Sequence, residues 1–374
     1  MRPRPDRIDR LPEQYFTSLL ARVAGAGPNV VDVGRGNPDI PPPPHVVEAL
    51  VESARERTTA VHGYPPFAGL REAKDAIVER YAGVYGVELD PEREVAFVPG
   101  TTSALIELAL VLANEGERIL VPDPGYPDYG SAVALAGAER VALSLADDGR
   151  PEWDAAPRER VAAVYLNYPS NPTAVAAPAD VFGEAVGFAR ETGAAIVHDF
   201  AYGDLVYEGR KPQSFLAHEG AREVGVEMFS LSKSYGMAGW RLGFVLGNGE
   251  IVGRLNWLQE HIRSGIFTSL QRAAIAALTG PQETVEERRA LYERRRDRTL
   301  AAIPNARCEG SFFVWFPLPG GLTFERLLDE HRVAVAPGEG FGERGRGFAR
   351  LSLATADAVL DEGLLRLRRA FGRE

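Results

Sequence analysis

The chain has 374 residues, of which 45% are hydrophobic and 25% are charged, and its formal net charge at pH 7 is −10. This composition is typical of a globular protein that buries one large core or two moderate ones, and the acidic balance argues against a nucleic-acid partner. The single cysteine, Cys308, excludes an intrachain disulfide and favours a cytoplasmic location. Because the N-terminus lacks the apolar segment of a signal peptide and no apolar run is long enough to span a bilayer, we expect no membrane partner.

The predicted elements begin with a helix over residues 12–24, a short strand in NVVDVG and the proline-rich stretch NPDIPPPP. From about residue 95 to about residue 247, short apolar β-type runs alternate with helical stretches; the runs include EVAFVPG, ERILVPDPGYP, RVAAVYLNYP, GAAIVHDF, VEMFSLSK and RLGFVLG. Continuous apolar strands that alternate with helices indicate a mainly parallel sheet with helices on both faces. The predicted fold class is therefore α/β.

The pattern changes after about residue 249. Three helical stretches follow one another, and then the β-type runs SFFVWF, HRVAVAPG and FARLSLA alternate with helices at 322–331 and 356–371. This is the pattern of a smaller α+β unit, which we expect the N-terminal segment to join as an arm. We therefore predict an N-terminal arm at 1–44, a large domain at 45–280 and a small C-terminal domain at 281–374.

Polar residues follow the ends of the predicted strands, where doubly wound sheets bind their ligands. They are Gly100, Thr101, Thr102, Tyr126, Asn167, Asn171, Asp199, Tyr202, Ser230, Ser232, Lys233 and Arg241. A glycine at the start of a helix suits an anion, because the first turn of the helix offers free N–H groups. Together with a carboxylate, an aromatic ring and a lysine, this set would suit a phosphorylated aromatic aldehyde such as pyridoxal phosphate, whose aldehyde reacts with an amine.

Lys233 is one of only three lysines among the 42 basic residues. Arginine cannot replace it in such a reaction, because a guanidinium stays protonated. A reactive amine needs a pKa below the usual value of about 10.4, and Arg241 and the apolar neighbours of Lys233 are candidates for lowering it. The other two lysines, Lys74 and Lys211, lie in a charged helix and a charged turn, where we expect solvated side chains. Taken alone, Lys233 could also be a surface lysine, and Asp199 a helix N-cap.

The segments NYPSNPT, HDFAY and SLSKSYGMAGWRLG, in this order, resemble the class I/II aminotransferases of the aspartate-aminotransferase fold. The resemblance extends to VDVGRGNPD, HGYPPFAG, PDPGYP and FARLSLA, and so covers nearly the whole chain. It implies a mainly parallel seven-stranded sheet in the large domain (PLP fold type I), a smaller α+β domain, and the cofactor pyridoxal 5′-phosphate. It also implies transfer of an amino group between an L-amino acid and a 2-oxo acid. The branch that holds the alanine-forming (glutamate–pyruvate) and LL-diaminopimelate aminotransferases is the most similar.

The resemblance assigns roles residue by residue. Lys233 matches the Schiff-base lysine that also moves the substrate proton, and Asp199 matches the carboxylate that pairs with the pyridine nitrogen. Asn171 and Tyr202 match the donors to the phenolic oxygen. Tyr126 matches the ring stacked on the pyridine. The phosphate binders are matched by Thr101, Thr102, Ser230 and Arg241, and the cofactor-binding set also includes Gly100 and Ser232.

Three further residues match positions that bind the substrate or reach across subunits. Arg350 matches the arginine that holds the substrate α-carboxylate, and Gly36 matches the small residue that lines the same carboxylate. Tyr64 matches a tyrosine that reaches the phosphate of the neighbouring subunit, which implies a homodimer with shared active sites. No spacing typical of metal ligands is present among the six histidines, so no metal site is expected.

The chain departs from the family pattern at several positions. Ala174 stands where relatives often carry glycine after NPT, and the loop after Tyr64 is about three residues short. Arg35 stands beside Gly36 where relatives often carry a smaller or apolar residue, and we hypothesise that it binds the distal carboxylate of a glutamate-like substrate; a structural or surface role stays open. A C–S lyase, decarboxylase or acyl transferase could use the same fold, and a non-enzymatic amino-acid sensor is a third possibility.

Overall fold

In the computed structural model, which describes residues 4–372, seven strands form one mixed sheet in the order β2-β8-β7-β6-β5-β3-β4. Their bounds are β2 (Val95–Val98), β3 (Arg118–Asp123), β4 (Glu139–Ser144), β5 (Val161–Asn167), β6 (Ala195–Asp199), β7 (Gly225–Ser230) and β8 (Gly243–Gly247). Strand β8 runs antiparallel to β2 and β7, and every other neighbouring pair is parallel. The predicted seven-stranded, mainly parallel sheet is confirmed.

Helices cover both faces of this sheet, which explains why its central strands are apolar throughout. Alternate strand residues go to opposite faces. Tyr165 and Val197 pack with α6 (Thr101–Leu112), α7 (Asp128–Ala136) and α11 (Gly249–Ile262). Leu166 and Ile196 pack with α5 (Arg71–Tyr85), α8 (Val181–Thr192) and α12 (Thr268–Thr279). Within residues 4–372, no helix combines the length and the apolar character that crossing a bilayer requires.

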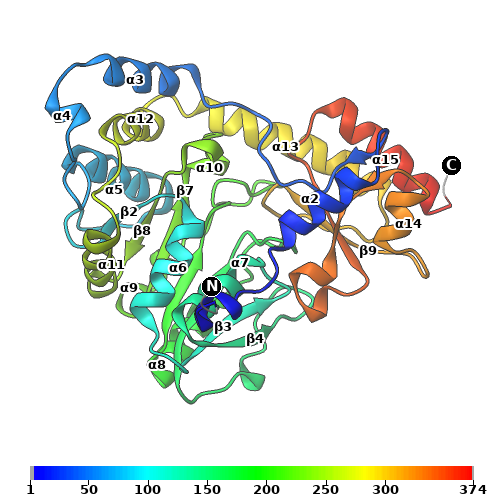
Figure 1. Cartoon of the computed structure of the whole chain (residues 1–374), viewed down its shortest axis with the longest axis horizontal. Coiled ribbons are helices and arrows are strands. Elements are labelled where there is room, and N and C mark those ends of the chain that lie inside the picture. The colour runs from blue at the N-terminus through cyan, green and yellow to red at the C-terminus, as the bar shows by residue number, and fades with distance from the viewer. Residues whose placement is uncertain (1–3, 373–374) are drawn as a thin grey trace.

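The second lobe is built on α13 (Glu283–Ala302), which runs from the large sheet region toward the C-terminal elements (Figure 1). An antiparallel sheet in the order β11-β12-β9 forms its centre, with β9 (Phe313–Pro317), β11 (Ala336–Pro337) and β12 (Phe348–Ser352). Helices α14 (Phe324–Asp329) and α15 (Asp357–Ala370) flank this sheet.

From the N-terminal segment, β1 (Val31–Asp32) pairs in parallel with β10 (Val333–Ala334). Helix α2 (Tyr15–Gly25) lies beside this lobe (Figure 1). The segment thus joins the smaller unit as expected, while the domain boundaries themselves stay a prediction. The remaining helices are α1 (Asp6–Asp9), α3 (Pro44–Arg55), α4 (Thr59–His62), α9 (Ala221–Val224) and α10 (Leu231–Ser234).

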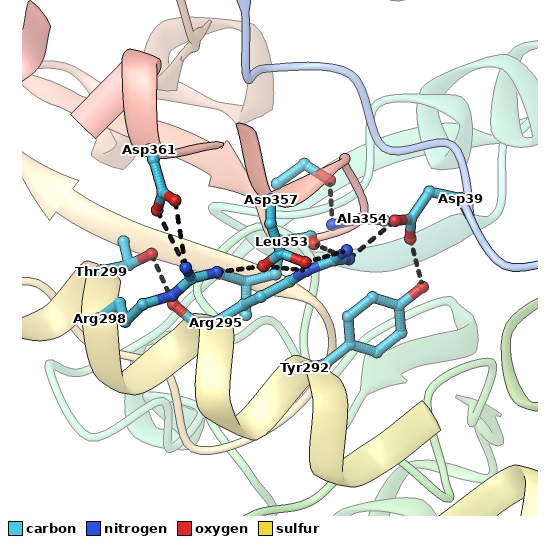
Figure 2. A network of polar contacts seen from close by, with 10 residues as sticks. Asp39, Tyr292, Arg295, Arg298, Thr299, Leu353, Ala354, Asp357 and Asp361 are labelled. Atoms are coloured by element: carbon cyan, nitrogen blue, oxygen red, sulfur yellow. Dashed lines mark hydrogen bonds and ion pairs between the residues drawn. The ribbon is translucent and has the colours of Figure 1, made fainter. Parts of the chain in front are cut away.

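A polar network fastens the segment after β1 to α13 and α15 (Figure 2). Arg295 of α13 is only 5% exposed; its Nη1 donates to Asp39 Oδ2 at 2.8 Å and to the Leu353 carbonyl at 3.0 Å. Its Nε lies 3.4 Å from Asp357 Oδ1, and the hydrogen bonds from Arg295 lower the pKa of Asp357. Tyr292 donates to Asp39 Oδ1 at 3.2 Å. The network therefore fixes one end of the 32–39 segment, which carries two of the residues singled out above.

Lys74 is not on a solvated helix face, so that expectation was wrong. Its side chain is 2% exposed within α5, and its Nζ lies 3.9 Å from Glu92 Oε2. The charged pattern of the α5 sequence hid this burial: the neighbouring Ala73 and Ile77 pack in a core cluster with residues of α12, and Lys74 lies on the same helix close to Glu92.

Candidate active site

One cavity of about 290 Å³ opens where β5, β6 and β7 end, against residues of the smaller lobe. All the predicted site residues except Gly100 and Tyr64 line it: Gly36, Thr101, Thr102, Tyr126, Asn171, Asp199, Tyr202, Ser230, Ser232, Lys233, Arg241 and Arg350. Asn167, Asp199 and Ser230 are the last residues of their strands. The carboxyl ends of neighbouring strands meet at one edge of a sheet, which is why residues so far apart in sequence gather here.

The anion-binding end of the cavity is built around the start of α6. Gly100 has φ +85°, a conformation that favours glycine, and its backbone lies against the Arg241 guanidinium, since a Cβ on it would lie 2.2 Å from Nη2. Arg241 itself has φ +57°, a rare conformation for a residue with a side chain. Ser230 caps α10, with its Oγ accepting from the Ser232 N–H at 3.2 Å. Free N–H groups of a 12-residue helix beside a guanidinium are suited to a phosphate.

Asp199 is a buried carboxylate at the cavity wall. Its Oδ2 accepts from the Tyr129 hydroxyl at 3.0 Å and its Oδ1 from the Ala201 N–H at 3.2 Å. Burial raises the pKa of Asp199 above its usual value, and these two hydrogen bonds act in the opposite direction. No helix starts in residues 200–204, so Asp199 is not a helix N-cap. Tyr129 was missed from the sequence because it lies inside α7 rather than at a strand end.

Lys233 lies on α10 and is half-buried, because its side chain opens onto the cavity. Within residues 4–372 its Nζ has no hydrogen-bond or ion-pair partner; it lies 5.2 Å from the Phe312 ring centroid and 5.8 Å from that of Tyr202. Burial, followed by the positive charges of Arg350 and Arg241, lowers the pKa of Lys233 to about 8. Both expected causes, burial and a cation, are present, but Arg350 contributes ahead of Arg241, which sequence reasoning did not anticipate.

Arg350 on β12 is a buried cation, 1% exposed. Its Nη1 donates to Asn171 Oδ1 at 2.6 Å and its Nη2 to the Gly34 carbonyl at 3.1 Å, while its Cζ lies 3.9 Å from the Phe313 ring centroid. In the described part of the chain no carboxylate pairs with it. Burial lowers its pKa to about 10. A buried guanidinium without a counter-charge, exposed only to a cavity, is a binding point for a carboxylate.

Four further positions singled out in the sequence lie at the edge of this arrangement or outside it. A Cβ on Gly36 would come within 2.8 Å of the Phe313 ring and 3.6 Å of Arg350 Nη2, so the chain passes very close to that guanidinium. Arg35 is exposed and lines the cavity, with no hydrogen-bond or ion-pair partner among residues 4–372. Tyr64 is 89% exposed and lies outside the cavity. Ala174 has φ +57°, the conformation that glycine adopts freely.

Comparison with known proteins decides the family. The model of the family "Aminotransferase class I and II" matches residues 28–367. The chain belongs to this family. A Bacillus subtilis protein named L-glutamine–4-(methylsulfanyl)-2-oxobutanoate aminotransferase is 42% identical to this chain over 377 residues. The alignment covers 96% of this chain and 94% of that protein. The LL-diaminopimelate aminotransferase of Desulforudis audaxviator is 38% identical over 384 residues, 98% of this chain and 97% of that protein.

Solved structures agree with this assignment. The substrate-bound structure of BacF from Bacillus subtilis superposes on this chain with a TM-score of 0.94 at 35% identity. The superposition covers 99% of this chain and 98% of BacF. An aspartate aminotransferase from Thermus thermophilus, in a double-mutant form, gives 0.89 at 28% identity, covering 99% and 100% of the two chains. The predicted family and fold are confirmed, and the aminotransferase uses amino acids and 2-oxo acids as substrates.

Proposed function

We propose that this aminotransferase works with pyridoxal 5′-phosphate and moves an amino group between an L-amino acid and a 2-oxo acid through Lys233. The observation that carries the proposal is the distribution of charge around the cavity. A lysine with a lowered pKa, a buried carboxylate and a buried arginine that has no counter-charge among the described residues all line the same small space, each positioned by different strands or helices. An amino acid that enters with its carboxylate at Arg350 comes close to the amine of Lys233.

The residues present fit this cofactor. A phosphate would be held by the first turn of α6, by Ser230 and by Arg241, where Gly100 leaves no room for a side chain. Asp199 would hold the protonated ring nitrogen, and Asn171 and Tyr202 the phenolic oxygen, with Tyr126 against the ring. When bound, pyridoxal phosphate supplies an aldehyde that combines with amines and a ring that withdraws electrons from the substrate Cα.

The lowered pKa gives Lys233 its role as a base. At pH 7 an amine with a pKa of about 8 is unprotonated in about a tenth of the molecules, against about four in ten thousand for a pKa of about 10.4. The free Nζ can therefore accept the proton that leaves the substrate Cα and release it again later in the reaction. The rings of Phe312 and Tyr202 lie beside Nζ, with centroids 5.2 Å and 5.8 Å away, and give the amine a partly apolar environment.

We propose glutamate with 2-oxoglutarate as one substrate pair, with alanine and pyruvate or diaminopimelate as the other. The relatives support different second substrates, since their names give diaminopimelate in one case and a methylsulfanyl oxo acid in another. Arg35 is an exposed cation that lines the cavity and has no hydrogen-bond or ion-pair partner among the described residues, which supports an acidic partner substrate.

We further propose that the enzyme is a homodimer whose active sites are shared. Tyr64 and Phe67 are 89% and 51% exposed, in the loop after α4. Beside this loop lies the start of α12: the Phe267 ring is 6.1 Å from that of His62, and a Cβ on Gly265 would be 2.8 Å from Pro65. Trp257 and Ile262 of α11 add further exposed apolar area. Such a concentration of apolar side chains supports an interface, from which Tyr64 would reach the cofactor phosphate of the partner.

A half-reaction assay tests the proposal against a C–S lyase. The protein is loaded with pyridoxal phosphate, mixed with a single amino acid and no oxo acid, and the products are counted. A transaminase yields one equivalent of 2-oxo acid per site and then stops, whereas a lyase releases pyruvate and ammonia repeatedly. A panel of donors and acceptors then identifies the substrate pair. Each donor (Ala, Glu, Asp, LL-diaminopimelate or an aromatic amino acid) is combined with 2-oxoglutarate or pyruvate as the acceptor. Continuous release of ammonia would refute the proposed reaction.

A further inference from the structure

A fully buried histidine and glutamate lie side by side behind the cavity. His198 and Glu227 are each 0% exposed, and the parallel pairing of β6 with β7 places them opposite one another, directly before Asp199 in the chain. Because side chains alternate along a strand, His198 points away from the cavity that Asp199 lines. Its ring packs among aromatic residues, with centroids 5.0 Å from Phe182 and 5.2 Å from Phe200. An apolar side chain would fill this place without the cost of burying polar atoms, so a polar pair here calls for an explanation.

Glu227 holds one edge of the histidine ring. Its Oε1 accepts from the Tyr81 hydroxyl at 3.0 Å and from the Ser214 hydroxyl at 2.8 Å. Its Oε2 accepts from the Phe215 N–H at 2.8 Å and lies 2.8 Å from His198 Nδ1. Because a carboxylate only accepts hydrogen bonds, Nδ1 is the donor in this last contact. Both oxygens are therefore fully used, and they fix the orientation of the ring.

The other edge of the ring meets the segment that leaves β5. His198 Nε2 lies 3.3 Å from the Tyr168 nitrogen and 3.1 Å from the Tyr168 carbonyl oxygen. A neutral ring accepts from the N–H at this edge, and a protonated ring donates to the carbonyl, so the ring holds Tyr168 in either charge state. Tyr168 directly follows β5 and opens the segment that carries Asn171. The ring thus ties β6 and β7 to the start of that segment.

A second contact ties the same segment to β6. Asn167 Nδ2 donates to the Asp199 carbonyl at 2.8 Å, and Asn167 Oδ1 accepts from the Asn171 N–H at 2.7 Å. Asn171 Oδ1 in turn accepts from Arg350 at 2.6 Å. The places of Asp199, Asn171 and Arg350 relative to one another therefore depend on how the 167–171 segment lies on β6, and His198 holds that segment from behind.

We propose that His198, oriented by Glu227, is a positioning residue that holds the 167–171 segment against β6, so that Asn171 and Asp199 keep their places at the cavity. This inference rests on the proposed function, in which Asp199 holds the cofactor ring nitrogen and Asn171 the phenolic oxygen. His198 does not line the cavity and acts only through these residues.

Two substitutions of His198 separate the two edges of its ring. In His198→Asn the shorter amide takes the place of Nδ1, and so reaches Glu227 but not Tyr168. In His198→Gln the longer amide takes the place of Nε2, and so reaches Tyr168 but not Glu227. Tyr81→Phe is the matched control, because it removes a buried hydrogen bond to the same carboxylate and leaves the contact with Tyr168 in place.

Three measurements are made on each variant: the Tm, the Kd of pyridoxal phosphate for cofactor-free protein by equilibrium dialysis, and kcat and KM in the half-reaction with glutamate and with alanine. We expect His198→Asn to raise the Kd of the cofactor and both KM values about tenfold, as when a group that orients a binding residue is removed. His198→Gln should stay within about threefold of the wild type, less than the loss of most hydrogen bonds causes. Tyr81→Phe should lower the Tm and leave Kd and KM unchanged.

The outcomes separate this inference from the proposed function. If His198→Asn lowers the Tm but keeps the wild-type Kd and KM, the pair serves stability alone, and the inference is wrong while the proposed function stands. It is also wrong if His198→Gln or Tyr81→Phe raises Kd and KM as much as His198→Asn does. If the wild type binds no pyridoxal phosphate, the proposed function fails and the inference fails with it.

A second variant keeps the test decisive should His198→Asn prove insoluble. His198→Leu places an apolar side chain beside Phe182 and Phe200 and also removes the contact with Tyr168. The same increases in Kd and KM are then expected, and wild-type values of both would overturn the inference.

Discussion

The guanidinium of Arg350 is paired with the amide of Asn171 and not with a carboxylate: Arg350 Nη1 donates a 2.6 Å hydrogen bond to Asn171 Oδ1. A neutral partner orients the cation without neutralising it. The stacked Phe313 ring, 3.9 Å from Cζ, restricts it further. Arg350 therefore remains a positive charge facing the cavity, and the same charge lowers the pKa of Lys233.

Replacing Arg350 with lysine should lower kcat/KM for every amino acid by about a hundredfold, because a lysine keeps the charge but cannot make the two parallel hydrogen bonds of a guanidinium. Steady-state kinetics with apolar and acidic amino acids measure this. Arg346→Lys, at an arginine whose side chain is 71% exposed, is the matched control and should leave kcat/KM unchanged. A loss limited to acidic substrates would show instead that Arg350 binds a distal carboxylate.

Lys233→Ala should bind pyridoxal phosphate and yet turn over at least about ten-thousandfold more slowly, because the amine that moves the proton is gone. Equilibrium dialysis measures cofactor binding, and oxo-acid formation measures turnover. The exposed Lys211 provides the control, since Lys211→Ala should retain full activity. Measurable transamination by Lys233→Ala, without any added amine, would reject the assignment.

Uptake of the aldehyde cofactor by cofactor-free enzyme should accelerate with pH and reach half its maximum near pH 8, the pKa of Lys233. The direction follows from the chemistry: only the unprotonated amine reacts, and the lowered pKa moves its appearance from above pH 10 to near 8. In Arg350→Gln the midpoint should move upward, because a cation that lowers this pKa has been removed. Stopped-flow absorbance at a series of pH values gives the midpoints, and a midpoint that stays fixed in Arg350→Gln would contradict the electrostatic coupling.

Sequence reasoning could bring together the polar residues that follow the ends of strands, which line one cavity in the structure. Asn171, Asp199 and Lys233 follow apolar runs, and the parallel sheet brings those ends together without any detailed knowledge of packing. It could not place residues whose neighbours depend on how helices lie across the sheet. Tyr129 reaches Asp199 from inside α7, a separation of 70 residues, and no local pattern marks it.

The same limit applies to the helix faces. The helical spacing of α2 is visible in the sequence, but its apolar face both packs against the core of the smaller lobe and lines the cavity, and this placement depends on contacts with Asp128, Pro337 and Asp329, far along the chain. Lys74 shows the opposite error. The charged helix sequence indicated a solvated side chain, whereas the Lys74 side chain is 2% exposed and lies near Glu92.

Arg35→Met should raise KM for glutamate and 2-oxoglutarate about tenfold or more and leave KM for alanine within about twofold, because one charge-assisted hydrogen bond to a distal carboxylate is lost. Arg35 is exposed at the cavity and has no hydrogen-bond or ion-pair partner among the described residues, so its replacement should change the free energy of unfolding little. Thermal unfolding of the variant checks that point. An equal change in KM for alanine and glutamate would contradict the hypothesis that Arg35 binds a distal carboxylate.

Mixing two defective variants tests whether active sites are shared. Tyr64→Phe loses the hydroxyl that would reach the partner's phosphate, so at limiting cofactor it should be largely inactive, and Lys233→Ala is inactive for the reason given above. In a mixed dimer one site combines the intact Lys233 of one chain with the intact Tyr64 of the other. Random exchange of subunits should then restore about a quarter of the wild-type activity. If Tyr64 acts only within its own chain, each site of the mixed dimer keeps one defect and no activity returns. Sedimentation of each variant before and after mixing establishes that dimers form and exchange, so that a failure to recover activity can be assigned to the site and not to assembly.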